Sequence, residues 1–317
     1  MGEKSRKDIL KLLSEQAYDV MITLVSTRKD LENLVQRKPD LVVLGVKSIL
    51  ADGKTGAEIW VGDYLEENGI RFTGSDSSAH VLESDKSLAK QRVLDSGLMT
   101  SEYIVLRKDE TFDYASADFD YPLFVKPLDR GGGVGVDTFS VVHNIDQLQS
   151  KTLSITLELH ADTLVENFLC GREFSVAVLL DEQTQEYHAM PIELLAPADV
   201  NGDKILSSSI KSADTETHQA VTDARLRKKL NELALDVFSA LGGRDYGRID
   251  IRLDAHGTPH FLEANLIPSI LKDYGNFPKA CLLNAGMSYQ DIILQIVRMG
   301  LAHEQWSVLE TSKLKIA

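Results

Sequence analysis

Cysteine is scarce in this sequence, with only Cys170 and Cys281 among 317 residues. Such a low number indicates reduced thiols rather than a disulfide framework, as is typical of cytosolic proteins. No apolar run approaches the roughly 20 residues that a membrane-spanning helix needs. The first residues also lack the apolar stretch of a secretory signal. We therefore expect a cytoplasmic protein without a membrane partner.

Positive charge is also scarce, because 34 lysines and arginines stand against 48 acidic residues. The formal net charge of −14 argues against broad binding to nucleic acid or to an anionic membrane. An anionic substrate stays open, since a local basic cluster can oppose the global sign. The histidines show no metal-ligand spacing, and the chain contains neither G-x-G-x-x-G nor a Walker A motif.

The sequence does contain the element pattern of an α/β enzyme. A hydrophobic content of 43% over this length is enough to bury the cores of two or three domains. The first part of the chain predicts a small doubly wound unit. Its expected strands cover residues 18–25, 40–46 and 70–73, and its expected helices cover residues 28–37 and 57–68.

The rest of the chain predicts further strands and two well-marked helices. One helix is expected to start at Ser84, as its cap, and to end before Gly97. The strongest helical periodicity covers Ala224 to Leu241. The other expected elements are strands at 103–106, 123–126, 163–168 and 173–180 and a final helix at 288–299.

The most informative segment is a predicted hairpin formed by residues 246–253 and 261–265. Because side chains alternate along a strand, Asp250 is expected to share a face with Phe261, Glu263 and Asn265. The opposite face is expected to pack into a core and carries Ile249, Ile251, Leu262 and Ala264. Two carboxylates and a carboxamide on one face suit Mg²⁺, which nucleotide phosphates and water would complete. The alternative is a polar face that simply meets solvent.

A second segment with chemical potential is a strand that ends at Lys126 and runs into a glycine-rich loop. The loop contains Gly131, Gly132, Gly133 and Gly135. Glycine lets backbone N–H groups approach a phosphate closely, and a lysine adds a compact positive charge. A loop of this kind is often only a flexible connection, so its meaning depends on the downstream hairpin.

A third segment, from Val165 to Leu169, is short and rich in apolar and aromatic residues. Such a strand can hold an adenine, and nearby carboxylates such as Glu166 and Glu173 can accept hydrogen bonds from the base or the ribose. Taken alone, it could equally be a hairpin with surface acids.

Together these segments resemble the ATP-grasp superfamily and are most similar to its D-alanine–D-alanine ligase branch. The resemblance extends from Asp40 to Met299. It implies an α/β protein with the ATP-grasp fold and an N-terminal Rossmann-like domain that precedes it. It further implies three parts: an N-terminal domain at 1–84, a central subdomain with the phosphate loop at 85–163, and a C-terminal subdomain with the metal site at 164–317.

The resemblance also implies roles for individual residues. Those expected to bind ATP are Lys86, Lys126, Gly132, Gly133, Glu166, Phe168, Leu169, Glu173 and Leu262. Those expected to hold two Mg²⁺ ions, or Mn²⁺ in their place, are Asp250, Glu263 and Asn265. The residues expected to act in catalysis are Arg248, Lys211 and Ser269, with Lys204 as an alternative to Lys211.

The implied activity is that of an ATP-dependent carboxylate–amine ligase that forms a C–N bond through an acyl phosphate. ATP and small amino-acid or carboxylate substrates are the expected partners, and the resembled family implies a homodimer. Two alternatives are an ATP-grasp phosphotransferase that stops at the acyl phosphate and a nucleotide-binding protein without turnover. The paired acids Asp250 and Glu263 count against the last of these.

The departures from the family pattern concern the amino acids rather than ATP. The first strand end, residues 24–29, lacks the carboxylate that the family uses for a substrate ammonium group. The family's His-Gly is replaced by a segment that contains Lys47, and its Pro-Gly by Pro268-Ser269. Two serines of the phosphate loop are replaced by Gly132 and Gly133. We therefore expect altered amino-acid substrates or a divergent D-alanine ligase.

Overall fold

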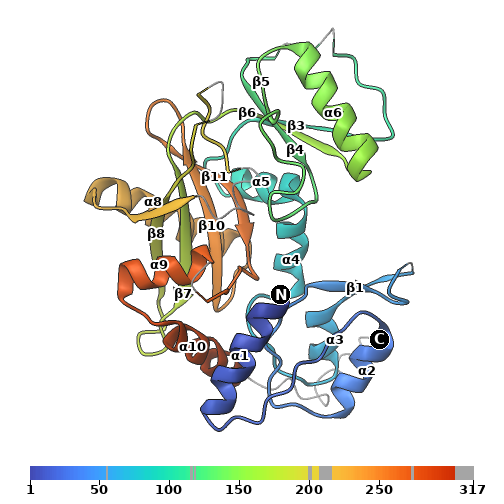
Figure 1. The fold of residues 1–317 in the computed structure, drawn as a ribbon, viewed down its shortest axis with the longest axis vertical. Coiled ribbons are helices and arrows are strands. Elements are labelled where there is room, and N and C mark those ends of the chain that lie inside the picture. Colours follow the sequence, from blue (N-terminus) through green and yellow to red (C-terminus); the bar gives the residue numbers. More distant parts are fainter. Residues whose placement is uncertain are drawn as a thin grey trace, which may run out of the picture.

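Three β-sheets organise the chain in the computed structural model, and the two larger ones lie next to each other (Figure 1). These sheets are counted over the part of the chain that the structure describes. That part comprises residues 1–54, 56–114, 117, 119–198, 202–206, 216–272 and 275–303. Within it, no helix is both long and apolar enough to cross a membrane.

The largest sheet has five antiparallel strands in the order β11-β10-β7-β8-β9. The strands are β7 (Glu173–Leu180), β8 (Tyr187–Leu195), β9 (Thr217–Ala220), β10 (Tyr246–Leu253) and β11 (Pro259–Asn265). The helices that cover it are α8 (Ala224–Ala240) on one face and α9 (Asn276–Ala285) and α10 (Tyr289–Ala302) on the other. Because both faces are covered, β7 is buried along almost its whole length.

The second sheet has four strands in the order β3-β6-β4-β5. Its strands are β3 (Tyr103–Leu106), β4 (Leu123–Pro127), β5 (Val141–Val142) and β6 (Thr163–Asn167). Helix α6 (Ile145–Leu159) packs on it through Leu148 and Ile155, which are buried with the strands in one core. The expected boundary between residues 163 and 164 falls at the start of β6. The division of the chain into three ranges stays a prediction.

The N-terminal lobe is less sheet-like than the sequence predicts. It contains α1 (Glu3–Glu15), α2 (Arg28–Gln36), α3 (Val61–Glu67) and a hairpin of β1 (Ser48–Leu50) with β2 (Glu58–Trp60). The expected strands at 40–46 and 70–73 meet only in one parallel bridge, between Val42 and Phe72. The expected strand at 18–25 is wrong, because this segment is irregular and leaves Met21 and Leu24 more than 60% exposed.

Two consecutive helices, α4 (Ser77–Ser84) and α5 (Lys86–Asp95), connect the N-terminal lobe to the two large sheets (Figure 1). The predicted cap at Ser84 is wrong by one residue. Asp85 caps α5, because its carboxylate accepts hydrogen bonds from the backbone N–H groups of Ser87 and Leu88. The predicted helix at 224–241 is confirmed as α8, which ends one residue earlier.

A buried lysine on α5 ties this helix to the four-stranded sheet. Lys90 is fully buried, and its Nζ lies 2.7 Å from the Glu166 carboxylate on β6. The same Nζ donates to the hydroxyl groups of Thr100 and Ser101 at 2.7 and 3.0 Å. Burial lowers the pKa of Lys90 to about 8, although the Glu166 charge opposes this shift.

The hairpin of β10 and β11 contains a β-bulge that the predicted alternation missed. Asp250 pairs with Glu263, but Ile251 pairs with Phe261, so Leu262 is the extra residue. Phe261 therefore turns into the core, where it is fully buried, rather than joining the acidic face. Leu262 takes the opposite side and lines the cleft between the two sheets, so the expectation that it packs into the core is wrong.

The bulge predicts opposite effects for two neighbouring side chains. Phe261→Ala should lower the free energy of unfolding by about 3–5 kcal/mol, because it leaves a cavity in a closed core. Leu262→Ala should cost much less, since its side chain borders open space. Urea unfolding of both variants measures the difference, and equal losses would contradict the bulge.

The lowered pKa of Lys90 predicts a pH dependence of stability. Between pH 8 and 10.5 the folded state holds Lys90 neutral while the unfolded state keeps it protonated, so raising the pH favours folding. As the pH rises across this window, the free energy of unfolding of the wild type should therefore increase relative to that of Lys90→Met. Its slope against pH should correspond to one proton that is bound only in the unfolded state. Unfolding free energies at several pH values test this, and parallel curves for the two proteins would refute it.

Candidate active site

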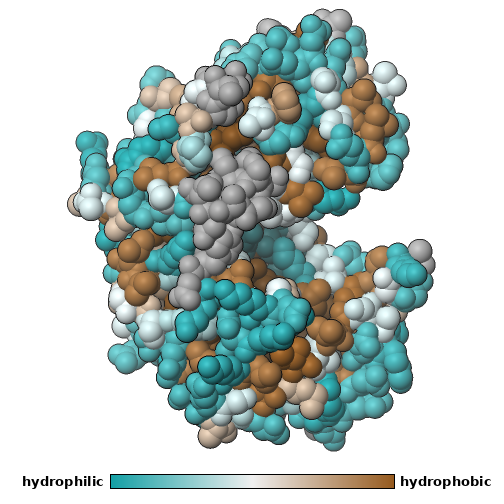
Figure 2. Space-filling model, in the orientation of Figure 1, coloured by the Kyte–Doolittle hydropathy of each residue, from teal (hydrophilic) through white to brown (hydrophobic). Residues whose placement is uncertain are grey.

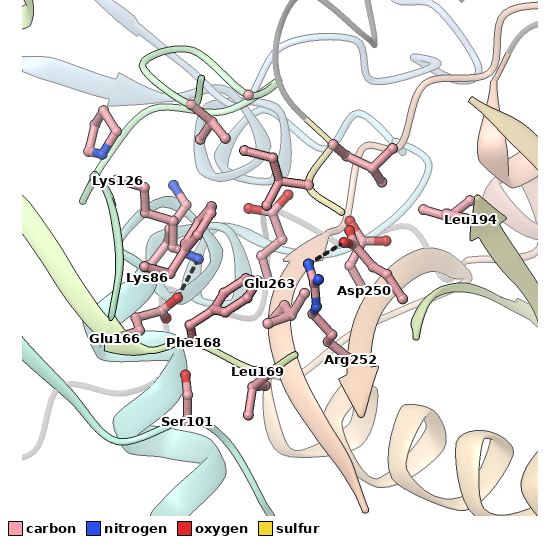
Figure 3. A pocket seen from close by; sticks show the side chains of 18 of the residues that line it. Lys86, Ser101, Lys126, Glu166, Phe168, Leu169, Leu194, Asp250, Arg252 and Glu263 are labelled. Carbon is pink, nitrogen blue, oxygen red and sulfur yellow. Dashed lines mark hydrogen bonds and ion pairs between the residues drawn. The ribbon is translucent and has the colours of Figure 1, made fainter. Parts of the chain in front are cut away.

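A pocket lies between the two large sheets and gathers most of the predicted site residues (Figure 3). It contains about 890 Å³ of empty space, including its open mouth. The predicted residues that line it are Lys86, Lys126, Gly133, Glu166, Phe168, Leu169, Glu173, Arg248, Asp250, Leu262 and Glu263. Residues far apart in the sequence thus form one site, although the roles expected of them stay predictions.

Among the described residues, three predicted ones do not line this pocket. Gly132 is exposed beside it, and Asn265 stands behind Asp250, to which its amide donates at 3.4 Å. Ser269 is exposed beyond the end of β11. Lys211 lies outside the described residues, while its alternative, Lys204, is exposed next to the pocket-lining Ile205.

A network of buried charges forms one end of the pocket. Glu166 on β6 lies between two lysines, with one oxygen 2.7 Å from Lys90 Nζ and the other 3.0 Å from Lys126 Nζ. Burial raises the pKa of Glu166, but the charges of Lys126 and Lys90 outweigh burial and lower it. Burial likewise opposes the charged form of Lys126, and the Glu166 charge overcomes it and raises the pKa. Both groups are therefore charged at neutral pH.

The sequence reasoning missed Lys90, although a signal for it existed. Lys86 and Lys90 stand four residues apart on α5, so they share one helix face. Lys86 donates from Nζ to the carbonyl oxygens of Leu128 and Arg130, at 3.2 and 2.6 Å. Burial, aided by the charge of Lys126, lowers the pKa of Lys86 against the attraction of Glu263.

The glycine-rich loop follows directly after these carbonyl groups. Gly132, Gly133 and Gly135 have φ values between 66° and 79°, a region that side chains disfavour. A Cβ at Gly135 would also lie 2.5 Å from Pro127 Cγ, whereas open space surrounds Gly132. The glycines therefore serve the backbone conformation of the loop.

Next to Lys126 the pocket wall is aromatic and apolar, and a charged residue that the sequence reasoning missed lies against it. Phe168 stacks against Phe124, with ring centroids 6.3 Å apart. The guanidinium of Arg252 lies 4.9 Å from the Phe168 ring and donates to the Glu173 carboxylate at 3.0 Å. Alternation along β10 could have revealed Arg252, because Arg248, Asp250 and Arg252 occupy every second position.

The acidic centre is formed by cross-strand partners on β10 and β11. Asp250 lies directly opposite Glu263, and both line the pocket. The Arg248 guanidinium donates to both Asp250 oxygens, at 3.0 and 2.8 Å, and the Ser175 hydroxyl donates at 2.8 Å. Burial opposes the charge of Arg248, but the neighbouring Asp250 outweighs it and raises the pKa of the guanidinium.

This donor set fits a metal that nucleotide oxygens complete. Among the described residues, no group of three or more His, Cys, Asp or Glu could hold a metal ion. Two carboxylates with one carboxamide are too few for a closed protein cage but match Mg²⁺, which usually takes one or two carboxylates and fills its shell with water and phosphate. The nearby lysines would face the same phosphates.

Comparison with known proteins identifies the family of this chain. Residues 93–298 match the family model described as D-ala D-ala ligase C-terminus. The chain is 28% identical to the D-alanine–D-alanine ligase of Geobacter sulfurreducens, over 91% of this chain and 86% of that protein. It is 30% identical to the uncharacterized protein y4sG of Sinorhizobium fredii, over 87% of this chain and 80% of that one.

Solved structures show the same fold. The D-alanine–D-alanine ligase of Bacillus anthracis superposes with a TM-score of 0.72 at 22% identity and covers 95% of this chain and 94% of its own. The same enzyme in complex with ATP gives a TM-score of 0.71 at 21% identity, with the same coverage. The expected ATP-grasp fold is thereby confirmed. With a family model that matches well over half of its length, the chain belongs to the D-alanine–D-alanine ligase family of ATP-grasp ligases.

Proposed function

We propose that this protein is an ATP-dependent carboxylate–amine ligase that works through an acyl phosphate. The observation that carries the proposal is the opposed pair Asp250 and Glu263 in the same pocket as the buried lysines Lys86 and Lys126 and the partly buried Arg248. Phosphoryl transfer needs little covalent chemistry from a protein and depends on cations that hold a spreading negative charge. The pocket supplies such groups on both sides.

ATP would lie with its base against Phe168 and Leu169 and its phosphates toward the glycine-rich loop. The stacked rings of Phe168 and Phe124 offer an apolar wall, which Leu262 extends. Glu166 would accept a hydrogen bond from an exocyclic amine and Glu173 from the ribose hydroxyl groups. Lys86, Lys126 and the N–H groups around Gly132 and Gly133 would hold the phosphates.

Asp250, Glu263 and Asn265 would hold two Mg²⁺ ions, or Mn²⁺ in their place. When bound, such ions neutralise phosphate charge and orient the transferred group. The protein contributes the fixed position of its ligands, because Ser175 and Arg248 restrain the Asp250 carboxylate. The negative charge of Glu263 favours the protonated forms of both Lys86 and Lys126, so the acids and the cations of the pocket lie near one another.

The reaction would proceed in two displacements. An oxygen of the acyl substrate's carboxylate would attack the γ-phosphorus, and the bond to ADP would break. The amine of the second substrate would then attack the acyl carbon, and phosphate would leave with its bonding electrons. Arg248 would hold the anionic group in both steps, with Lys211 over the site and the backbone N–H of Ser269 as a donor.

The substrates are proposed to be small amino acids or other carboxylates, in a cytoplasmic homodimer. The Geobacter sulfurreducens relative is named a D-alanine–D-alanine ligase. This chain departs from the family pattern at Lys47 and Ser269, so we propose either a different amino-acid pair or a divergent use of D-alanine. The retained acids, Asp250 and Glu263, weigh against a protein that only binds nucleotide.

A screen for ADP release tests this function most broadly. The intact protein is incubated with ATP, Mg²⁺ and single or paired amino acids and small carboxylates, with hydroxylamine added to trap acyl phosphate as a hydroxamate. A ligase should release ADP only with an acid and should couple it to an amine. Acid-dependent release that ignores every amine would favour a phosphotransferase, and tight ATP binding without any release would favour a non-catalytic protein.

The metal assignment predicts a large loss of turnover in one variant. Glu263→Gln should lower kcat by about 100-fold or more, because a neutral amide binds Mg²⁺ poorly and leaves phosphate charge exposed. Its thermal unfolding midpoint should stay close to that of the wild type, since the side chain borders the pocket. Glu67→Gln, at an exposed position on α3, is the matched control. Full activity in Glu263→Gln would refute the assignment.

A further inference from the structure

A second charged cluster lies where the N-terminal lobe meets the end of β11. Its centre is Glu83, in the last turn of α4, whose side chain is only 3% exposed. One of its oxygens lies 2.8 Å from Lys47 Nζ and also accepts from the backbone N–H of Leu266 at 2.8 Å. The other lies 3.0 Å from His80 Nδ1. None of these residues lines the nucleotide pocket.

The Glu83 carboxylate is saturated by partners from this chain. Burial raises its pKa, but the hydrogen bond with His80 and the charge of Lys47 outweigh burial and lower it. Because Glu83 is buried and already accepts from three groups, it has no accessible oxygen for the ammonium group of a substrate. The negative end of the Lys47–Glu83 pair is therefore internal.

The positive end of the pair points outward instead. The Lys47 side chain keeps 32% of its surface exposed. An ammonium group has three donors, and Glu83 accounts for one of them, so further donors are available to a ligand. Lys47 stands just after the extended segment that bridges to Phe72 through Val42, where the carboxyl ends of parallel strands commonly face a ligand.

Contacts through Glu83 link Lys47 to the proposed reaction centre. Glu83 binds the N–H of Leu266, the residue directly after Asn265. The Glu83 charge also acts on the guanidinium of Arg248, which lines the pocket. Two cations therefore flank one buried carboxylate, Arg248 on the pocket side and Lys47 in the N-terminal lobe. Figure 2 shows a hollow between this lobe and the lobe of the four-stranded sheet.

We propose that Lys47 binds an anionic group of the acyl substrate, so that this substrate is a dicarboxylic acid or an acid with a comparable second anion. One carboxylate would approach Arg248 and receive phosphate, while the second would pair with Lys47. The inference rests on the proposed ligase function and names the class of its first substrate. The inference follows from the exposure of the two charges in this cluster. The cation Lys47 is accessible to a ligand, whereas the carboxylate Glu83 is buried, so among the described residues of the cluster an anion finds a partner and an ammonium group does not.

Direct binding tests the inference separately from turnover. The intact protein, with Mg²⁺ and a non-hydrolysable ATP analogue, is titrated calorimetrically with succinate and glutarate and with butyrate and alanine, which carry a single carboxylate. The dicarboxylates should bind at least about tenfold more tightly. Lys47→Gln should weaken their binding by about 10- to 100-fold, the loss expected for one hydrogen bond to a charged group. Its affinity for the ATP analogue should change less than about twofold.

Two further variants keep this test interpretable. Lys54→Gln removes an exposed lysine of the same lobe and should leave dicarboxylate binding unchanged. The double variant Lys47→Gln with Glu83→Gln removes both charges, so no buried carboxylate is left without a cation. It should still lose dicarboxylate binding. Equal affinity for mono- and dicarboxylates, or unchanged binding in Lys47→Gln, overturns the inference. Absence of ADP release with every acid would instead contradict the ligase function, whatever Lys47 binds.

Discussion

The antiparallel pairing of β10 with β11 is the constraint on which the rest of the site depends. It sets Asp250 opposite Glu263 and turns Phe261 into the core, so the acidic centre and the packing of the sheet are fixed by the same register. Because the side-chain period of a strand is two, a shift of one residue would send the acids into the core. The bulge at Leu262 corrects the alternation locally and adds an apolar side chain to the pocket wall.

The charges around this hairpin form a continuous arrangement across three parts of the chain. Lys90 and Lys126 hold Glu166 in the four-stranded sheet, Arg248 holds Asp250 in the five-stranded sheet, and Lys47 holds Glu83 at the N-terminal lobe. Each of these carboxylates thus has a cationic partner, which offsets the cost of burying it in a low-dielectric interior. A substrate placed between these pairs meets cations that are already held in position.

The sequence alone was enough to predict the helix α8, the β10–β11 hairpin and 11 of the residues that line the pocket, because strong periodicity and turn residues act locally. It could not predict the bulge that turns Phe261 inward, because the alternation of polar and apolar residues along a strand does not reveal where an extra residue is inserted. It also missed Lys90 and Arg252, whose partners Glu166 and Glu173 lie far away in the chain. The wrong strand at 18–25 has apolar side chains that find no neighbouring strand.

We propose that the two opposed carboxylates, Asp250 and Glu263, hold divalent ions only together with a nucleotide. The most direct measurement is electron paramagnetic resonance of Mn²⁺ with the intact protein, with and without a non-hydrolysable ATP analogue. We expect Mn²⁺ to bind the protein only when the analogue is present, because two carboxylates need phosphate oxygens to complete the ligand shell of the metal. We also expect this binding to be lost in Asp250→Asn. Binding that is unaffected by Asp250→Asn, or no bound Mn²⁺ with the analogue present, would contradict it.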